Sequence, residues 1–566
     1  MSESSSRPTS FTRREFLERS IAGALTSSIT SSIAASTSLL ALGVIPRSAA
    51  IHLPSRRTYD VVIRGGTVFD GTGAPGIDAD VAISGDRVVA IGRSLGDSAR
   101  EVIDARGLAV APGFIDIHSH ADGTMFQDPR SESVIRQGVT TVIVGQDGSS
   151  RGPTTDGRTL DTVFTAIDAL PPTLNVASMV GLGTVRHVVV GDADRPATAA
   201  ELARMTALVE AALAAGACGA SSGLEYTPGE FAPRDELIAL CRPLASRRLP
   251  YATHMRNEDD RVLESVAEAI AVATGAGCPL QISHLKTEGP RNWEKLDTVF
   301  AHIEHAHRSG LDVAFDRYPY VAYQTGLSNL FPKWSEDGGT DAFVARLADA
   351  SLTSKLREAV TQKIALLGGW DHVLISDVKD PADRAVEGQR LGAYASATHQ
   401  DPYDAAVALL TRSHGDVGMV GFAMSEENLK RILAHPLAMV CSDGGAAALD
   451  GAAHAGHPHP RSLGTFPRIL GTYVRETRTL TLPQAIHKMS GFAASRVKLA
   501  DRGRLATGFA ADVVIFDPAT VRDRATFAEP FQYPDGIRTV LVNGAVALRD
   551  GQHAPERHGR ALRIAR

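Results

Sequence analysis

Two histidines separated by a single residue, His118 and His120, are the first candidates for chemistry in this sequence. They follow an Ala-Pro-Gly break at residues 111–113 and a short apolar run. Side chains alternate between the two faces of a strand, so these two imidazoles are expected to point the same way. Two converging imidazoles can hold a divalent metal ion. The spacing therefore predicts part of a metal site.

Further side chains able to bind metal follow other apolar runs of the chain. Each stands at or just after the end of a strand-like segment: Asp147, Glu225, His254, His284 and Asp443. All are imidazoles or carboxylates, which suit one or two Zn²⁺ ions and tolerate other divalent metals. Bound metal acidifies water and polarises a carbonyl. Asp443 would orient or deprotonate that water and pass the proton to a leaving nitrogen, which is hydrolysis of an amide-type bond.

Alternating strands and helices are expected to position these side chains. Eight strand-like runs occur, at residues 114–118, 138–145, 174–181, 218–224, 249–254, 279–284, 311–316 and 438–443. Helical stretches such as 199–215 and 261–274 separate them. This pattern predicts an α/β fold, a TIM-like (β/α)8 barrel over residues 111–499 with its chemistry at the carboxyl ends of the strands. The long gap after the seventh strand predicts a lid insertion at about residues 321–386.

Short alternating strands with glycine turns flank this barrel. They occupy residues 51–110 and return in residues 500–566. Strands of this length joined by Gly and Asp turns favour a small β-sheet unit. We expect one small β-sandwich domain assembled from both parts of the chain.

Composition limits the possible partners. The 566 residues carry a net charge of −6 with scattered basic residues, which argues against nucleic acid. The four cysteines show no C-x-x-C spacing and are expected to be buried. Beyond the first fifty residues, no uninterrupted apolar run is long enough to span a bilayer, so no stable membrane span is expected in the mature chain.

Residues 1–50 differ from the rest of the chain. The pair Arg13-Arg14 precedes a mildly apolar stretch at residues 21–45, and small residues at 48–50 suit cleavage. This segment resembles a bacterial twin-arginine signal peptide, which carries folded proteins across the inner membrane. We therefore expect the mature enzyme in the periplasm.

Several longer motifs resemble those of the N-acyl-D-amino-acid deacylase (D-aminoacylase) family of the amidohydrolase superfamily. The resemblance runs from about residue 59 to residue 549. The motifs are Pro-Gly-Phe-Ile-Asp-Ile-His-Ser-His at 112–120, Tyr-Ala-Thr-His-Met-Arg-Asn-Glu at 251–258, Ile-Ser-His-Leu-Lys at 282–286, Asp-Arg-Tyr-Pro-Tyr at 316–320, Ser-Asp-Gly at 442–444 and His-Pro-Arg at 459–461.

The resemblance implies roles for particular residues. It implies zinc on His254 and His284, a second, looser metal position at His118, His120 and Asp443, and Asp443 as the catalytic acid and base. It also implies a small-molecule substrate with a free carboxylate, bound by Lys286, Arg461 and a tyrosine, Tyr318 or Tyr320. Arg offers a carboxylate a bidentate fork and Lys a point charge, so these roles are also physically sensible. Arg256 and Glu258, close to His254 in the sequence, are candidates to fix its tautomer by contacting the ring nitrogen that does not bind metal.

One position departs from the family pattern. Well-known members carry a cysteine metal ligand after the second strand, where this chain has Gly-Gln-Asp-Gly at residues 145–148. Either Asp147 or Glu225 must complete the tighter site with an oxygen ligand. Glu225 is slightly favoured as the bridge between two metals, with Asp147 close enough to bind the metal or to form a hydrogen bond.

The residues and the resemblance leave three functions to consider. The leading hypothesis is metal-dependent removal of the acyl group from an N-acyl amino acid, with the D configuration implied by the resemblance. The alternative within the superfamily is a dipeptidase of the D- or isoaspartyl type, or a cyclic-amide hydrolase. A non-catalytic barrel that only binds ligands would not need Asp443 and the full set of histidines, all of which are present.

Overall fold

Eight short parallel strands form the centre of the structure, a computed structural model that describes residues 59–95 and 98–564. In ring order they are β6 (Phe114–Asp116), β7 (Val139–Val144), β8 (Asn175–Ser178) continued by β9 (Val180–Gly181), β10 (Ala220–Gly223), β11 (Tyr251–His254), β12 (Leu280–Ile282), β13 (Val313–Arg317) and β17 (Ala438–Val440). Each predicted run contains one of these strands. β8 and β9 share one position on either side of Met179.

Backbone hydrogen bonds close the ring between its last and first strands. Asp443 N donates to His118 O at 2.9 Å, and His120 N donates to Gly444 O at 2.9 Å. These bonds lie just beyond the carboxyl ends of β17 and β6. Closure therefore also brings Asp443 beside the two histidines.

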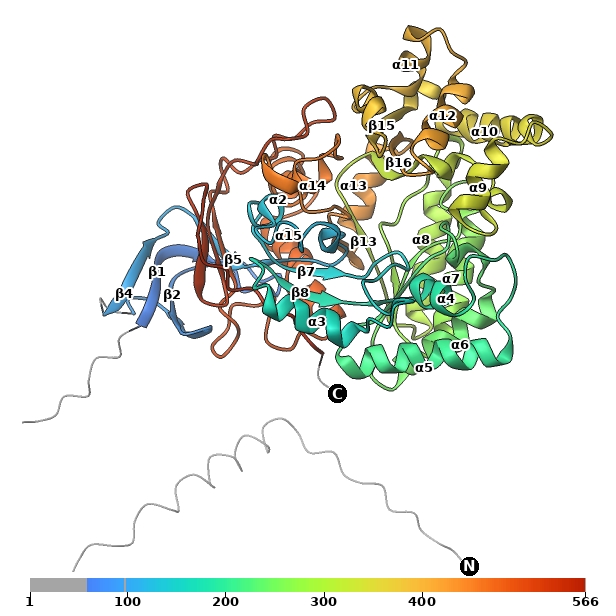
Figure 1. The fold of residues 1–566 in the computed structure, drawn as a ribbon. Helices are drawn as coiled ribbons and strands as arrows, with labels where there is room; N and C mark the ends of the chain where they lie inside the picture. The colour runs from blue at the N-terminus through green and yellow to red at the C-terminus, as the bar shows by residue number, and fades with distance from the viewer. Residues whose placement is uncertain (1–58, 96–97, 565–566) are drawn as a thin grey trace, which may run out of the picture. The chain divides into compact units, whose positions relative to one another are not determined.

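Amphipathic helices cover the ring, as in Figure 1: α3 (Leu160–Ala169), α5 (Ala199–Ala215), α6 (Arg234–Ala245), α7 (Val262–Ala276), α8 (Leu296–Arg308), α13 (Glu426–Ala434) and α15 (Leu482–Met489). α7 illustrates the pattern. Its buried residues Val262, Val266, Ala269 and Ala273 recur every three or four positions and form one stripe. The helix ends at Gly277 in the left-handed conformation, which glycine adopts without strain.

A nine-stranded sheet joins the two flanking parts of the chain. From the first part come β1 (Tyr59–Val68), β2 (Ile77–Ser84), β3 (Arg87–Gly92), β4 (Ala99–Asp104) and β5 (Ala109–Pro112). From the second come β18 (Val513–Phe516), β19 (Ile537–Val542), β20 (Ala545–Arg549) and β21 (Gln552–His553). The two parts meet where β5 pairs antiparallel with β18. That this sheet is a separate β-sandwich domain stays a prediction.

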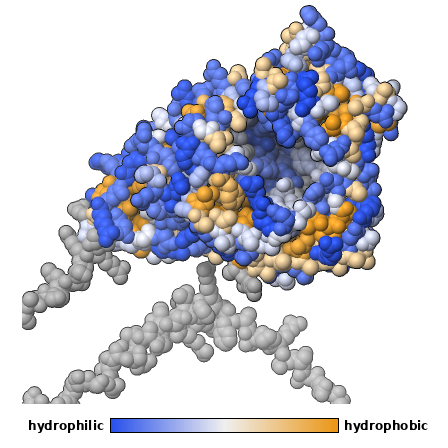
Figure 2. All heavy atoms as spheres, viewed as in Figure 1, coloured by the Kyte–Doolittle hydropathy of each residue, from blue (hydrophilic) through white to orange (hydrophobic). Residues whose placement is uncertain are grey.

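A large insertion separates β13 from β17. It contains β14 (Ala322–Gly326), α9 (Thr340–Leu347), α10 (Thr353–Leu367), β15 (Val373–Val378), α11 (Leu391–Ala397), α12 (Pro402–Arg412) and β16 (Val417–Phe422). The expected lid, residues 321–386, covers only its first part. The insertion itself extends to Phe422, because β16 is the central strand of an antiparallel sheet with β14 and β15. Figure 2 shows the molecular surface hollowed beside this insertion.

Two expectations about individual segments can be compared with the structure. All four cysteines are buried and free, in line with the expected packing role. Within the described residues, no helix combines the length and apolar character needed to cross a bilayer. The predicted signal peptide lies outside the described residues.

Candidate metal centre and active site

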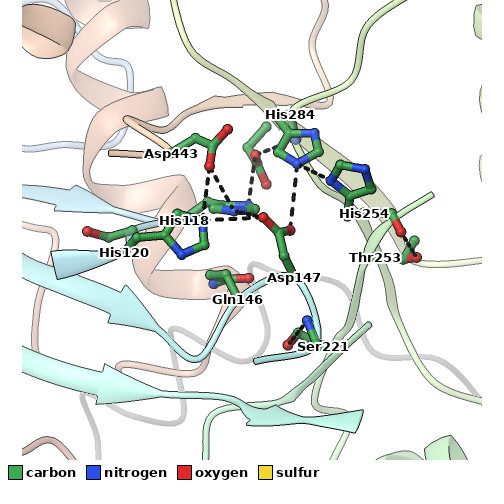
Figure 3. A network of polar contacts seen from close by, with 12 residues as sticks. His118, His120, Gln146, Asp147, Ser221, Thr253, His254, His284 and Asp443 are labelled. Carbon is green, nitrogen blue, oxygen red and sulfur yellow. Dashed lines mark hydrogen bonds and ion pairs between the residues drawn. The ribbon is translucent and has the colours of Figure 1, made fainter. Parts of the chain in front are cut away.

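Four predicted ligands meet at the carboxyl ends of β6, β7 and β17 (Figure 3). His118 Nε2 lies 3.2 Å from Asp147 Oδ2 and 3.5 Å from Asp443 Oδ1. His120 Nε2 lies 3.3 Å and 3.1 Å from the same two oxygens. One ligand atom from each of these four residues lies within 4.8 Å of the others. The segment after β6 therefore directs both imidazoles toward two carboxylates, which is the arrangement of a metal site.

A second group adjoins the first. His254, at the end of β11, places Nδ1 3.0 Å from His284 Nε2, and that His284 nitrogen lies 3.6 Å from Asp147 Oδ1. Asp147, His254 and His284 again offer ligand atoms within 4.8 Å of one another. Asp147 thus belongs to both groups, and Figure 3 shows its carboxylate between His118 and His284.

Asp147, rather than the slightly favoured Glu225, is the residue that these two groups share, and a bridging role of Glu225 stays a prediction. The Glu225 carboxylate lies 3.3 Å from His254 Nε2 and forms a third possible ligand group with His254 and Glu258, but it does not join the His118 group. Asp147 occupies the central position because the turn after β7 folds tightly inward. Asp147 has φ +50°, and a Cβ at Gly145 or Gly148 would collide with the backbone of Met179 or Gly223.

The chemistry of these residues fits a metal. Asp147 Oδ1, which lies 3.6 Å from His284 Nε2, is a buried atom without a hydrogen-bond partner among the described residues. An unsatisfied buried polar atom is costly, so a ligand is expected at Asp147 Oδ1. The combined set consists of imidazole nitrogens and carboxylate oxygens, which zinc accepts.

Asp443 is paired with Arg461, at the start of α14 (Arg461–Arg468). Arg461 Nη1 donates to Asp443 Oδ2 at 2.6 Å. Burial works to raise the pKa of the Asp443 carboxyl, but the Arg461 charge and the hydrogen bond to His120 outweigh it and hold the pKa well below its usual value. Asp443 is therefore ionised. Within the described residues Arg461 Nε has no hydrogen-bond partner, so this guanidinium keeps a donor for another ligand.

Lys286 lies in the wall of the same cavity, close to Glu258 and His284. Its Nζ donates to Glu258 Oε2 at 2.5 Å and lies 2.7 Å from His284 Nδ1. Glu258 Oε1 is 3.3 Å from that same nitrogen, so His284 Nδ1 faces the Lys286–Glu258 pair while Nε2, on the other side of the ring, faces Asp147. Burial raises the pKa of Glu258, but Lys286, His254 and His284 lower it to about 2.

Of the two expected outer partners of His254, only Glu258 touches the histidines. Arg256 points elsewhere and binds Glu268 and the carbonyls of Glu230 and Ala232. Glu258 stands four residues after His254 and ends the family-like motif at residues 251–258.

The two tyrosines differ in position. Tyr318 is fully buried, lines the cavity and has a hydroxyl without a hydrogen-bond partner among the residues that the structure describes. Tyr320 does not line the cavity. Its hydroxyl donates to Pro460 O at 3.4 Å, and its ring packs on His459. Tyr320 N donates to Tyr318 O at 3.0 Å, so a tight turn around Pro319 sends the two side chains apart, and of the two predicted tyrosines the structure brings Tyr318 to the cavity.

The cavity above these groups has a volume of about 610 Å³. Its wall includes residues that sequence patterns did not single out, among them Tyr226, Tyr323 and Asp192. Tyr226 and Asp192 come from loops after the strands, and Tyr323 comes from β14 of the insertion. No local motif marks such positions, because the loops approach one another only in the folded chain.

Comparison with known proteins identifies the family. The profile of the amidohydrolase family matches residues 101–548. The chain is 35% identical to a D-aminoacylase of Alcaligenes xylosoxydans xylosoxydans over 517 residues, which are 88% of this chain and 96% of the relative. An N-acyl-D-glutamate deacylase of the same organism is 37% identical over 522 residues, with coverage of 89% and 96%.

A solved structure agrees with these relatives. The N-acyl-D-glutamate deacylase of Bordetella bronchiseptica, in complex with zinc and a phosphonate mimic of the tetrahedral intermediate, superposes with a TM-score of 0.77. It is 36% identical, and the match covers 90% of this chain and all of that one. The chain described here belongs to the amidohydrolase family, in its N-acyl-D-amino-acid deacylase group.

Proposed function

We propose that this protein hydrolyses the amide bond of N-acyl-D-amino acids with bound zinc. One observation carries the proposal. Two metal-ligand groups that share Asp147 lie in the same cavity, and Asp443, a member of one of them, is ion-paired with Arg461. The relatives named above as D-aminoacylase and N-acyl-D-glutamate deacylase, one of them solved with zinc, support the substrate class and the metal.

The residues divide into metal-holding and proton-transferring groups. Asp147, His254 and His284 would hold one zinc ion, and His118, His120, Asp147 and Asp443 a second. Zinc supplies a Lewis acid for the scissile carbonyl and lowers the pKa of water. The Asp443 carboxylate would accept the proton of the attacking water and return it to the leaving nitrogen, so that the amine departs uncharged.

The substrate carboxylate is assigned to the wall that carries positive charge. Arg461 keeps a free Nε, Lys286 adds a second charge, and Tyr318 offers an unpartnered hydroxyl. Together they give the substrate a fixed end, which holds the scissile amide beside Asp443.

A paired assay tests this function. Zinc-loaded protein comprising residues 51–566 is incubated with N-acetyl-D-norleucine and N-acetyl-L-norleucine, and free amino acid is measured together with metal content. Release from the D substrate alone is expected. Bound metal without hydrolysis of either substrate would refute the proposal, and dipeptides and cyclic amides would then be assayed.

The two tyrosines provide a matched pair of variants. Tyr318→Phe removes the unpartnered hydroxyl and is expected to raise KM about tenfold, because a hydrogen bond to a charged group contributes about 1.5 kcal/mol or more. Tyr320→Phe, which alters a hydroxyl outside the cavity, is expected to leave KM unchanged. Steady-state kinetics on the D substrate decide between them. Equal effects of the two substitutions would remove Tyr318 from the binding site.

We also propose export to the periplasm by the twin-arginine route. The support is the Arg13-Arg14 pair followed by a mildly apolar stretch and small residues. Replacing both arginines by lysine is expected to retain the protein in the cytoplasm, as measured by cell fractionation. Export of that variant at the parental level would contradict the proposal.

A further inference from the structure

A smaller cavity continues the active-site cavity toward the insertion. Its volume is about 230 Å³, and we name it the acidic annex. It shares six wall residues with the main cavity: Asp192, Glu225, Tyr226, Thr227, Thr325 and Asn329. Glu225 Oε2 lies 3.3 Å and the Tyr226 hydroxyl 3.5 Å from ring nitrogens of His254. The annex therefore begins at the metal centre.

The annex wall carries charge of one sign. Asp192, Glu225 and Glu336 contribute carboxylates, and no lysine, arginine or histidine occurs among its described wall residues. Two lysines act on Glu225 from outside the annex wall: Lys333 binds its backbone carbonyl, and against the effect of burial the charges of Lys363 and Lys333 help to lower the pKa of its carboxyl. Asp192 contacts one basic group, the exposed imidazole of His187, at 2.6 Å. A cavity lined in this way favours a cationic ligand.

A second observation points to a ligand where the main cavity adjoins the annex. Tyr323 is 6% exposed and lines the main cavity, yet its hydroxyl has no hydrogen-bond partner within the described part of the chain. Tyr323 and Thr325 of β14 both line the main cavity, and Thr325 also borders the annex. A phenol oxygen accepts a hydrogen bond from an ammonium or guanidinium group.

We propose that the annex, with the adjoining Tyr323–Thr325 wall, binds the cationic side chain of a basic N-acyl-D-amino acid. This inference rests on the proposed function and names its substrate class. Arg461 and Lys286 hold the substrate carboxylate, and the metal groups and Asp443 hold the amide. The annex opens from the metal centre beside His254, and its carboxylates select a side chain that ends in positive charge. An acidic side chain would meet three like charges there.

Three substrates with side chains of similar length separate the effect of side-chain charge from that of side-chain size. N-Acetyl-D-lysine, N-acetyl-D-norleucine and N-acetyl-D-glutamate are compared by kcat/KM at low ionic strength. We expect kcat/KM for the lysine substrate to exceed that for the norleucine substrate by about tenfold, which is the effect of one well-placed charge contact. The glutamate substrate should have the lowest kcat/KM. Added salt should reduce the lysine preference, because part of the annex is exposed to solvent.

Two carboxylates outside the proposed metal groups allow a sharp test. Asp192→Asn combined with Glu336→Gln is expected to bring kcat/KM for the lysine substrate to within about twofold of the value for norleucine on the same variant, and this ratio cancels any effect of the substitutions on the cavity as a whole. Asp341→Asn is the matched control. This carboxylate lies on α9 of the same insertion, is 92% exposed and does not border the annex. It should preserve the lysine preference.

The outcomes separate this inference from the proposed function. Failure to hydrolyse any N-acetyl-D-amino acid would refute the function itself. Hydrolysis of norleucine or glutamate as fast as lysine would leave the function in place and overturn the annex proposal. Faster cleavage of glycyl-D-norleucine than of N-acetyl-D-lysine would also overturn it, because the annex would then hold the amino end of a dipeptide.

Discussion

Asp443→Asn is expected to lower kcat on an N-acetyl-D-amino acid by about a thousandfold, within the range for loss of a general acid and base. The amide of Asn has nearly the shape of the carboxylate and can still accept the hydrogen bond from Arg461 at the position of Oδ2. It cannot take a proton from water or return one to the leaving nitrogen. The substitution therefore removes the proton transfer and changes the packing little.

Arg468, at the other end of α14, forms a second arginine–aspartate pair that supplies the control. Arg468 Nη1 donates to Asp523 Oδ2 at 3.1 Å, and neither residue lines the cavity. Asp523→Asn is expected to change kcat by less than about twofold, because the carboxylate that it removes is also paired with an arginine but lies outside the active-site cavity. Single-turnover kinetics, metal analysis and circular dichroism on both variants make the comparison. A kcat for Asp443→Asn within tenfold of the parent, with metal retained, would show that another group moves the proton.

Asp147→Ala is expected to reduce zinc affinity by more than about a hundredfold, because one ligand of four carries roughly a quarter of a binding free energy of about 12 kcal/mol. Both ligand groups lose a member in this variant, since Asp147 lies in each of them. Zinc remaining after dialysis against a weak chelator is the direct measurement, and kcat should fall in parallel.

Two further variants make this prediction specific. Glu225→Ala should lower zinc affinity less than tenfold, because His254 is the one ligand histidine that Glu225 contacts among the described residues and Glu225 lies outside the His118 group. Asp147→Cys puts a thiolate where the resemblance expects one and should retain a tightly bound zinc. Loss of metal in Glu225→Ala with full metal in Asp147→Ala would reverse the assignment of the bridge.

The sequence by itself determined the barrel and most residues at its mouth. Eight apolar runs of strand length, separated by helical stretches, leave few alternatives to a (β/α)8 barrel. In such a barrel the carboxyl ends of all strands face one side. Residues placed there by their position in the chain, such as His118, His254 and Asp443, therefore had to converge, even though they are far apart in sequence.

Only the tertiary structure decided the details that depend on turns and on loops far apart in the chain. Asp147 rather than Glu225 lies between the two ligand groups because a turn with positive φ folds against the next two strands. Tyr318 rather than Tyr320 faces the cavity because a hydrogen bond around Pro319 breaks the alternation of a strand. The annex exists only where Asp192, Glu225 and Glu336 meet. Backbone torsions and contacts between distant loops have no period in the sequence, so folding alone settles them.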